Sequence, residues 1–134
     1  MIPSGNKVLT TTIDVVKQPS KQYRMNLNNN RILGTCDNLE AVKQSVFKIL
    51  NTERYEYLIY SWNYGIELKD LYGQPPMYVC PEIERRVKEA LSQDDRITSI
   101  DNFEFDILKK GVVSVSFTVH TIFGDMDEEM VVNI

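Results

Sequence analysis

The amino-acid sequence predicts an α+β fold in which an antiparallel sheet packs against two main helices. Apolar residues recur at helical spacing in the segments 39–51 and 81–91, and they alternate with polar residues from 97 to 134. We expect the sheet to combine this C-terminal meander with N-terminal strands. The 134 residues suffice for one domain with a buried core. We therefore predict a single domain over 1–134, with 1–20 forming an extended N-terminal strand or arm.

Composition is that of a globular protein, with 43% hydrophobic and 25% charged residues. A net charge of -4 argues against bulk binding of nucleic acid, which needs a basic surface. No apolar segment approaches the length of a membrane span, and we expect no membrane partner and synthesis in the cytoplasm. Two distant cysteines, Cys36 and Cys80, form neither a disulfide framework nor a metal set. We expect no cofactor and no metal.

The N-terminal part reads as three short strands followed by a helix. Segment 8–16 is rich in β-branched residues but is cut off by Pro19, so we expect it to pair with a distant element or another chain. Segment 23–33 alternates around three asparagines and predicts a hairpin. Asp37 and Glu40 fit a capping box at the start of the first helix, 39–51.

The middle of the chain is rich in aromatic residues. Enrichment in Tyr and Trp over 55–62 favours a strand, and we prefer core or loop packing of these rings to a ligand cage. Segment 66–72 predicts one or two helical turns that end at Gly73.

A second helix is predicted to begin at Pro81, because the pair Pro75 and Pro76 excludes a helix just before it. Glu82 and Glu84 then lie at the positive end of the helix dipole. The apolar stripe comprises Ile83, Val87, Ala90 and Leu91, whereas Arg85, Arg86, Lys88 and Glu89 are predicted to face outward.

Three strands follow, with turns at 109–111 and 124–125. Phe103, Phe105 and Ile107 are predicted to share one face of the first strand. Residues expected in the core are Phe105, Val115, Phe117, Val119, Val132, Ile83, Val87 and Leu91. The last strand runs to the chain terminus, so its outer edge can pair with a partner. This makes Val131 and Asn133 candidate interface residues, as segment 8–16 does for Thr11 and Ile13.

No phosphate loop, GxSxG or HExxH motif is present, and His120 falls on the polar face of the middle meander strand. Carboxylates that could serve a glycan hydrolase are Glu53, Glu56, Glu67, Asp70, Glu82 and Glu84. Their spacing pairs no two of them, so hydrolysis of cell-wall glycan is the alternative and not the preferred function. A small adaptor that binds DNA is a second alternative, which requires a basic face.

The order of three features resembles a known family. The aromatic–glycine step Tyr64-Gly65 is followed by a proline-led helix and then by Asp94, Asp95 and Arg96 before a strand. This is similar to the baseplate wedge family of contractile phage tails, historically called lysozyme-like, and to its XkdS-like branch of defective prophages and tail-like bacteriocins. That family carries a Glu-Pro-Arg triplet, in which Asp94 and Asp95 replace the first two residues here. Arg54 matches an arginine that precedes the aromatic step.

The resemblance implies a structural protein without catalytic residues. It would be assembled into the baseplate of a virion or tail-like particle, surround the tail tube and template the first sheath ring by strand exchange. Implied partners are other wedge proteins, the sheath protein and the tube or hub proteins, with about six copies around the tail axis. The residues expected at a partner interface are Asp94, Asp95, Arg96, Arg54, Tyr64, Gly65, Val131, Asn133, Thr11 and Ile13.

Overall fold

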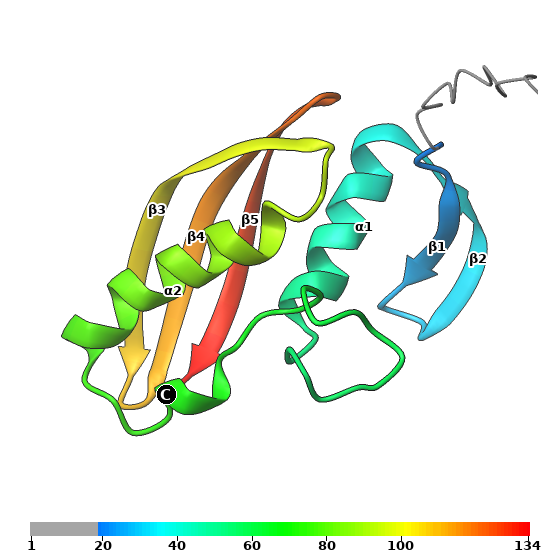
Figure 1. The fold of residues 1–134 in the computed structure, drawn as a ribbon. Coiled ribbons are helices and arrows are strands. Elements are labelled where there is room, and N and C mark those ends of the chain that lie inside the picture. Colours follow the sequence, from blue (N-terminus) through cyan, green and yellow to red (C-terminus); the bar gives the residue numbers. More distant parts are fainter. Residues whose placement is uncertain (1–18) are drawn as a thin grey trace, which may run out of the picture.

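A computed structural model describes residues 19–134 (Figure 1). The predicted strand at 8–16, with Thr11 and Ile13, lies outside the described residues. The elements are β1 (Gln22–Asn26), β2 (Arg31–Cys36), α1 (Asn38–Leu50), the short 3-10 helix η1 (Lys69–Leu71), α2 (Pro76–Leu91), β3 (Ile97–Lys109), β4 (Val112–Thr121) and β5 (Gly124–Asn133). The predicted α+β class is confirmed.

The strands divide between two antiparallel sheets, β1–β2 and β3–β4–β5, so the prediction of one combined sheet is wrong. A side chain of α1 explains the separation. Gln44 Oε1 accepts the Met25 amide at 2.9 Å, and Gln44 Nε2 donates to the Tyr23 carbonyl at 2.6 Å. Main-chain groups of β1 are thereby satisfied by a helix instead of a strand. The hairpin sits beside α1 at one end of the molecule (Figure 1).

Helix α1 begins where the sequence predicts it. The Asp37 side chain accepts the amide of Asn38 at 2.8 Å, as an N-cap residue does. The second half of the predicted capping box is not formed, because Glu40 pairs with Arg24 of β1 at 2.9 Å. The ion pair between β1 and α1 thus takes the place of the predicted hydrogen bond from Glu40 to the start of its own helix.

Helix α2 begins at Pro76, not at Pro81 as predicted. Pro76 occupies the first helical turn, where a missing amide costs nothing, while Pro81 lies inside the helix. The hydrogen bond that Pro81 cannot donate would go to Met77, which is 92% exposed, so water can solvate that carbonyl. Glu82 and Glu84 therefore lie beyond the first turn, and Glu84 pairs with Lys88 at 2.7 Å.

The aromatic segment 55–62 contains turns and no strand, so the strand prediction is wrong. Its rings contact one another: Tyr60 packs edge-on against Tyr57 and stacks on Tyr64 with ring centroids 4.6 Å apart. Leu58 and Ile59 at the tip of the loop are almost fully exposed. Local stacking therefore takes the place of pairing with a neighbouring strand.

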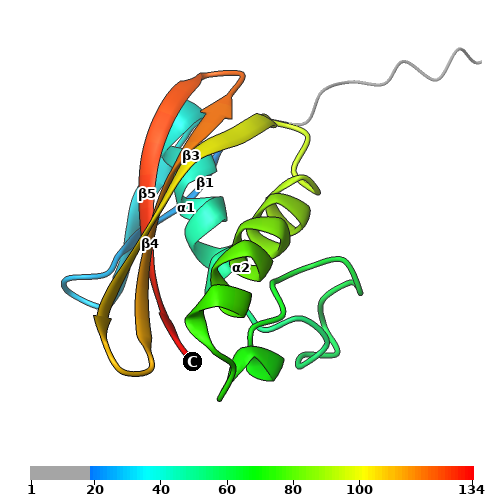
Figure 2. The same cartoon turned by 90° about the vertical axis from the view of Figure 1, so that its left-hand side faces the viewer.

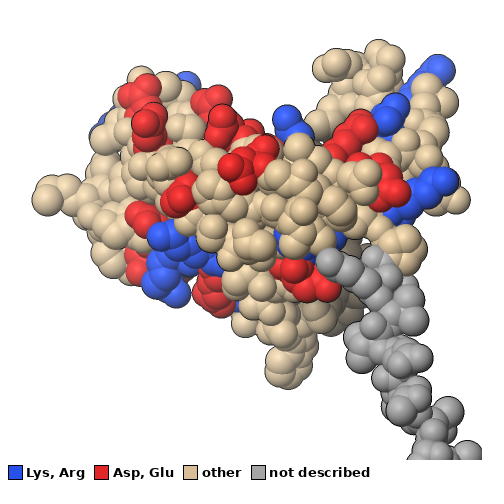
Figure 3. All heavy atoms as spheres, turned by 90° about the horizontal axis from the view of Figure 1, so that it is seen from above, with Lys and Arg blue, Asp and Glu red and all other residues tan. Residues whose placement is uncertain are grey.

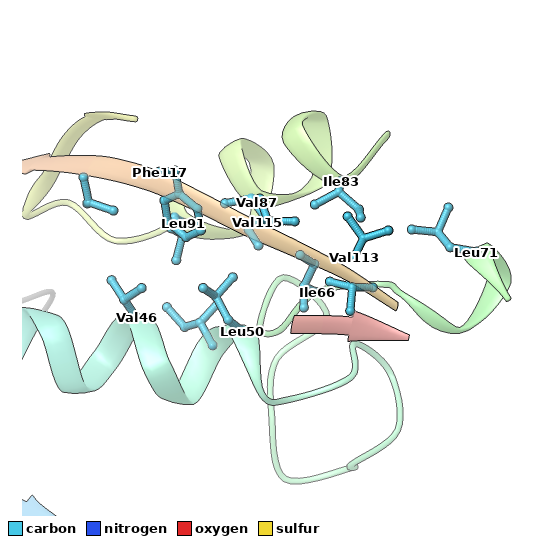
Figure 4. Packing of buried hydrophobic residues seen from close by; sticks show 14 of the residues in the cluster. Val46, Leu50, Ile66, Leu71, Ile83, Val87, Leu91, Val113, Val115 and Phe117 are labelled. Atoms are coloured by element: carbon cyan, nitrogen blue, oxygen red, sulfur yellow. The ribbon is translucent and has the colours of Figure 1, made fainter. Parts of the chain in front are cut away.

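The core lies between one face of the three-stranded sheet and the two helices (Figures 2 and 4). In Figure 4, Val113, Val115 and Phe117 of β4 pack with Ile83, Val87 and Leu91 of α2 and with Val46 and Leu50 of α1. Val119 of β4 is buried in the same cluster. The predicted core is confirmed except at Phe105, which is half-buried on the outer strand β3. Ile107 lies opposite the buried Val113, as Phe105 lies opposite Val115, so both share the predicted face of β3. Ile107 is nevertheless 55% exposed, because it lies near the end of this edge strand. The last turn is at 122–123, two residues earlier than predicted.

Replacing Phe117 with alanine should lower the free energy of unfolding by about 3–5 kcal/mol, because the emptied site is enclosed on all sides. Phe117 is 2% exposed and stacks on Phe103 at 5.3 Å between ring centroids. Urea unfolding followed by circular dichroism measures the change. Ile107→Ala, on the exposed end of β3, is the matched control and should cost under about 1 kcal/mol. Equal losses in the two variants would contradict the assigned buried face.

Candidate protein–protein interface

Five of the predicted interface residues line one surface hollow. Tyr64, Gly65, Asp94, Asp95 and Arg96 surround it. The β4–β5 turn contributes Ile122 and Phe123, and the chain just before β1 contributes Pro19 and Ser20. Segments that are far apart in the sequence thus meet where α2 ends and β3 begins.

Arg96 and Asp94 form a nearly buried ion pair in the wall of this hollow. The Arg96 guanidinium donates to both Asp94 oxygens, at 2.9 and 2.7 Å, and its Nη2 also donates to Ser45 Oγ of α1 at 3.0 Å. Burial alone would raise the pKa of Asp94, but the hydrogen bonds from Arg96 outweigh it and hold that pKa below its ordinary value. The pair therefore joins the end of α2 to α1.

Arg54 and Gly65 are brought together beside the same hollow. Arg54 Nη2 and Nε donate to the Gly65 carbonyl at 3.1 and 3.3 Å, and Nη1 donates to Glu89 of α2 at 2.8 Å. Gly65 has φ +94°, and a Cβ there would lie 2.5 Å from the Thr52 carbonyl oxygen. Arg54 thereby links the aromatic loop, residues 55–65, to α2. Gly65 lacks the side chain that would prevent the close approach to Thr52.

The other two predicted interface residues in the described part of the chain lie on β5. Val131 is 58% exposed, and Asn133 is exposed as well. Ile134 donates its amide to the Gly111 carbonyl at 2.8 Å, and Val132 pairs with Val113. Because hydrogen-bonded pairs alternate in an antiparallel ladder, the amides and carbonyls of Val131 and Asn133 point away from β4. Within residues 19–134, no strand pairs with that edge.

Sequence reasoning missed the role of Arg86, which was expected to face outward. Arg86 is 8% exposed and forms a bidentate pair with Asp70, in addition to bonds to Glu82 and to the Glu67 carbonyl. These contacts raise the pKa of Arg86, with Asp70 the largest cause. The spacing of four residues between Glu82 and Arg86 could have predicted their ion pair. No sequence pattern indicated the pair with Asp70 of η1.

Five of the six carboxylates considered for glycan hydrolysis pair with cations or main-chain amides. Both oxygens of Glu53 accept the Leu68 amide, at 3.1 and 3.2 Å. Hydrogen bonds from Arg86 and Arg85 lower the pKa of Asp70 and of Glu82, respectively. A general acid in this reaction needs the opposite shift.

His120 lies on the face of the sheet that points away from the helices. It contacts Asp125 at 2.8 Å and Asp101 at 2.9 Å, and these two carboxylates raise its pKa, Asp125 most. In residues 19–134, no group of three or more His, Cys, Asp or Glu side chains could hold a metal ion. Nor does that part of the chain contain a helix long and apolar enough to cross a membrane.

Residues 20–124 match the family model of the contractile injection system sheath initiator. The chain belongs to this family. It is 39% identical over 122 residues to the phage-like element PBSX protein XkdS of Bacillus subtilis strain 168, which covers 87% of this chain and 85% of XkdS. These findings confirm the resemblance to baseplate wedge proteins.

The fold of this sheath initiator family member also has a counterpart among solved structures. A Geobacter sulfurreducens protein named as a tail lysozyme superposes with a TM-score of 0.59. The match covers 71% of this chain and 89% of that protein. At 19% identity, the likeness concerns the fold alone. Family membership makes the chain a component of a contractile tail, in association with other tail or sheath proteins.

Arg96→Ala should lower the free energy of unfolding by about 3 kcal/mol, because it leaves the nearly buried Asp94 carboxylate without its cation. Arg24→Ala, which breaks the exposed pair with Glu40, is the control and should cost under about 1 kcal/mol. Paired Asp94 stabilises the native state above its ordinary pKa of 3.8 and loses this effect as pH falls through its lowered native pKa. The difference in the free energy of unfolding between wild type and Arg96→Ala should therefore become smaller at acidic pH. A difference that is constant with pH would contradict this assignment.

Gly65→Ala should destabilise the protein by about 2 kcal/mol or more, since the new Cβ meets the Thr52 carbonyl as well as an unfavourable φ. Gly73→Ala is a matched control with φ +78° and no atom within 4 Å of the added Cβ. It should lose only about 1 kcal/mol. Thermal unfolding of both variants measures the difference, and equal losses would show that the close approach at Gly65 is relieved without cost.

Proposed function

We propose that this protein starts assembly of the sheath in a contractile tail or tail-like particle. It surrounds the tail tube in the baseplate layer, in several copies, and offers the free edge of β5 to an extended segment of a sheath subunit. The observation that carries the proposal is the row of main-chain groups on β5 that no strand of residues 19–134 pairs with, which includes those of Val131 and Asn133. An added strand would form hydrogen bonds along this whole row.

The shape of the protein supports this function. Two helices cover one face of the sheet, and α1 is the one nearer to β5 (Figures 1 and 2). Within residues 19–134, no strand pairs with the outer edge of β5. A hollow beside this edge is lined by Phe47 and Leu50 of α1 and by 129–133 of β5. An incoming strand can therefore pair with β5 and pack its side chains against α1.

The hollow that contains Arg96 supports a second contact, with another wedge protein. Its polar wall is the Asp94–Arg96 pair, and its apolar wall includes Ile122 and Phe123, which are 42% and 38% exposed. In this arrangement Arg96 and Arg54 act by holding the shape of the surface, while Tyr64 and Asp95 contact the partner. The contacts of Glu53, Asp70 and Glu82 described above favour this structural role over glycan hydrolysis.

Val131→Pro should abolish binding of the purified sheath subunit while the protein still folds. Proline removes only the amide that points away from β4, and proline is tolerated on edge strands. Val131→Ala keeps the amide and should bind within about threefold of wild type. Biolayer interferometry with the sheath subunit of the same particle measures both, and circular dichroism verifies folding. Full binding by a folded Val131→Pro variant would overturn the proposed use of this edge.

A further inference from the structure

The edge strand β5 carries a carboxylate that residues 19–134 leave only partly satisfied. Glu128 Oε1 is buried and has no hydrogen-bond partner among residues 19–134. In the described part of the chain, the closest cation is Lys43 Nζ of α1, at 4.0 Å, which is beyond hydrogen-bonding distance. The Glu128 side chain is 16% exposed, and burial raises its pKa. A group of this kind destabilises the protein unless something else pairs with it.

The lack of a hydrogen-bond partner is specific to Glu128 among the acidic residues of β5. Three acidic residues on the opposite face of the strand each contact a side chain of β4. Asp125 contacts His120 at 2.8 Å, Asp127 accepts from Thr118 at 2.7 Å, and Glu129 accepts from Ser114 at 2.7 Å. Glu128 alone among these acids points toward the helices, because it pairs in register with the buried Phe117.

Glu128 opens into a hollow that the free edge of β5 borders. The hollow lies between β5, α1 and the β1–β2 hairpin, and it is lined by Met25, Leu27, Lys43 and Phe47, among others. Phe47 also lines the hollow along 129–133, so apolar surface continues beside the edge. Arg24 in the same hollow is already paired with Glu40.

The position of Glu128 in the ladder places it directly opposite a residue of an added strand. Its main-chain groups bond to β4, so at the outer edge it occupies a non-hydrogen-bonded position, where opposing side chains approach most closely. The side chain across from Glu128 would share its face and enter the hollow. An added strand would also cover the carboxylate further, which makes a neutral neighbour costly and a cation favourable.

We propose that the segment that pairs with β5 is a strand of the sheath subunit with a Lys or Arg across from Glu128 and an apolar residue across from Met130, beside Phe47. This inference rests on the proposed function and specifies the chemistry of its partner. The acidic groups along β5 favour the same sign of charge on the sheath strand: Asp125, Asp127, Glu128 and Glu129 all lie within one short run. In the view from above, several acidic side chains lie among uncharged residues over the left half of the molecule, where Figure 1 shows the sheet (Figure 3).

The test compares binding of the purified sheath subunit with thermal stability in the full-length chain. Glu128→Gln should weaken binding about tenfold, the scale of a hydrogen bond to a charged group, and Glu128→Lys should weaken it further. Glu129→Gln is the matched control on the other face and should bind like wild type. Glu128→Gln should unfold at the same temperature as wild type or a higher one, since it removes a buried charge. A residue with only a structural role would not raise stability and weaken binding together.

Two further variants identify the cation that pairs with Glu128. Lys43→Ala should bind at least as well as wild type, because it removes a competing amine. A loss equal to that of Glu128→Gln would instead make Lys43 the partner and overturn the proposal. Replacing the Lys or Arg of the sheath strand with Glu should restore binding to Glu128→Lys.

Other outcomes separate this inference from the proposed function. If Val131→Pro abolishes binding but Glu128→Gln binds like wild type, strand addition stands and the charge pairing is wrong. If Val131→Pro binds fully, both are wrong. The chain's own segment 8–16 is flanked by Lys7 and Lys17. Should the effect of Glu128→Gln disappear in a Lys7→Gln, Lys17→Gln double variant, that segment occupies the edge and the sheath strand does not.

Discussion

Three partly buried guanidinium groups hold the irregular parts of this protein to its helices, and the rest of the structure depends on them. Between α1 and α2 the chain has no strand, only one bridge between Glu53 and Ile66 and a short 3-10 helix. Arg54 and Arg86 tie this segment to α2 through carbonyls and carboxylates, and Arg96 ties the end of α2 to α1. Because arginine donates several hydrogen bonds from a fixed plane, each can serve two elements at once.

This arrangement explains why no segment of residues 19–134 pairs with the outer edge of β5. Main-chain groups of the β1–β2 hairpin bond to Gln44 of α1, and the aromatic loop is fastened by Arg54, so neither segment adds a strand to β5. The core needs only the helix-facing side of the sheet, through Phe117 and its neighbours. The core is thus buried without any strand from residues 19–134 at the outer edge of β5. Under the proposed function, this protein folds first and accepts a partner strand afterwards.

Patterns of short range were enough to predict the fold class, both helices and the meander. Alternation at 113, 115, 117 and 119 placed β4 correctly, since a strand with one buried face leaves that trace. Prediction failed where a distant residue decides the outcome. Proline rules alone put the start of α2 at Pro81, although Pro76 also satisfies them. Aromatic enrichment suggested a strand at 55–62, where ring stacking and the Arg54–Gly65 contact make a loop. Arg86 seemed solvent-facing because its partner Asp70 is far away in sequence.

The predicted interface residues show the same limit: the sequence indicated where they lie but not what each side chain contacts. The family resemblance pointed to Tyr64, Gly65, Asp94, Asp95 and Arg96, and the structure brings these five into one hollow. It also shows that Gly65 and Arg96 act inside the wall of that hollow, which no sequence pattern could reveal. Glu128 was missed altogether. It sits in a run of acids, and only the register with Phe117 separates it from its neighbours.

An open edge strand is a hazard for aggregation, and natural proteins protect such edges with charge. On β5 the acids Asp125, Asp127 and Glu129 lie on the outer face and are satisfied by β4, so they give the edge a negative character at little cost. Two copies of β5 brought edge to edge would bury like charges. A strand with Lys or Arg would instead bring opposite charges together, above all at Glu128, whose buried Oε1 has no hydrogen-bond partner among residues 19–134. The same charges that discourage pairing between identical chains therefore favour one class of partner, so protection and specificity on this edge have a single physical origin.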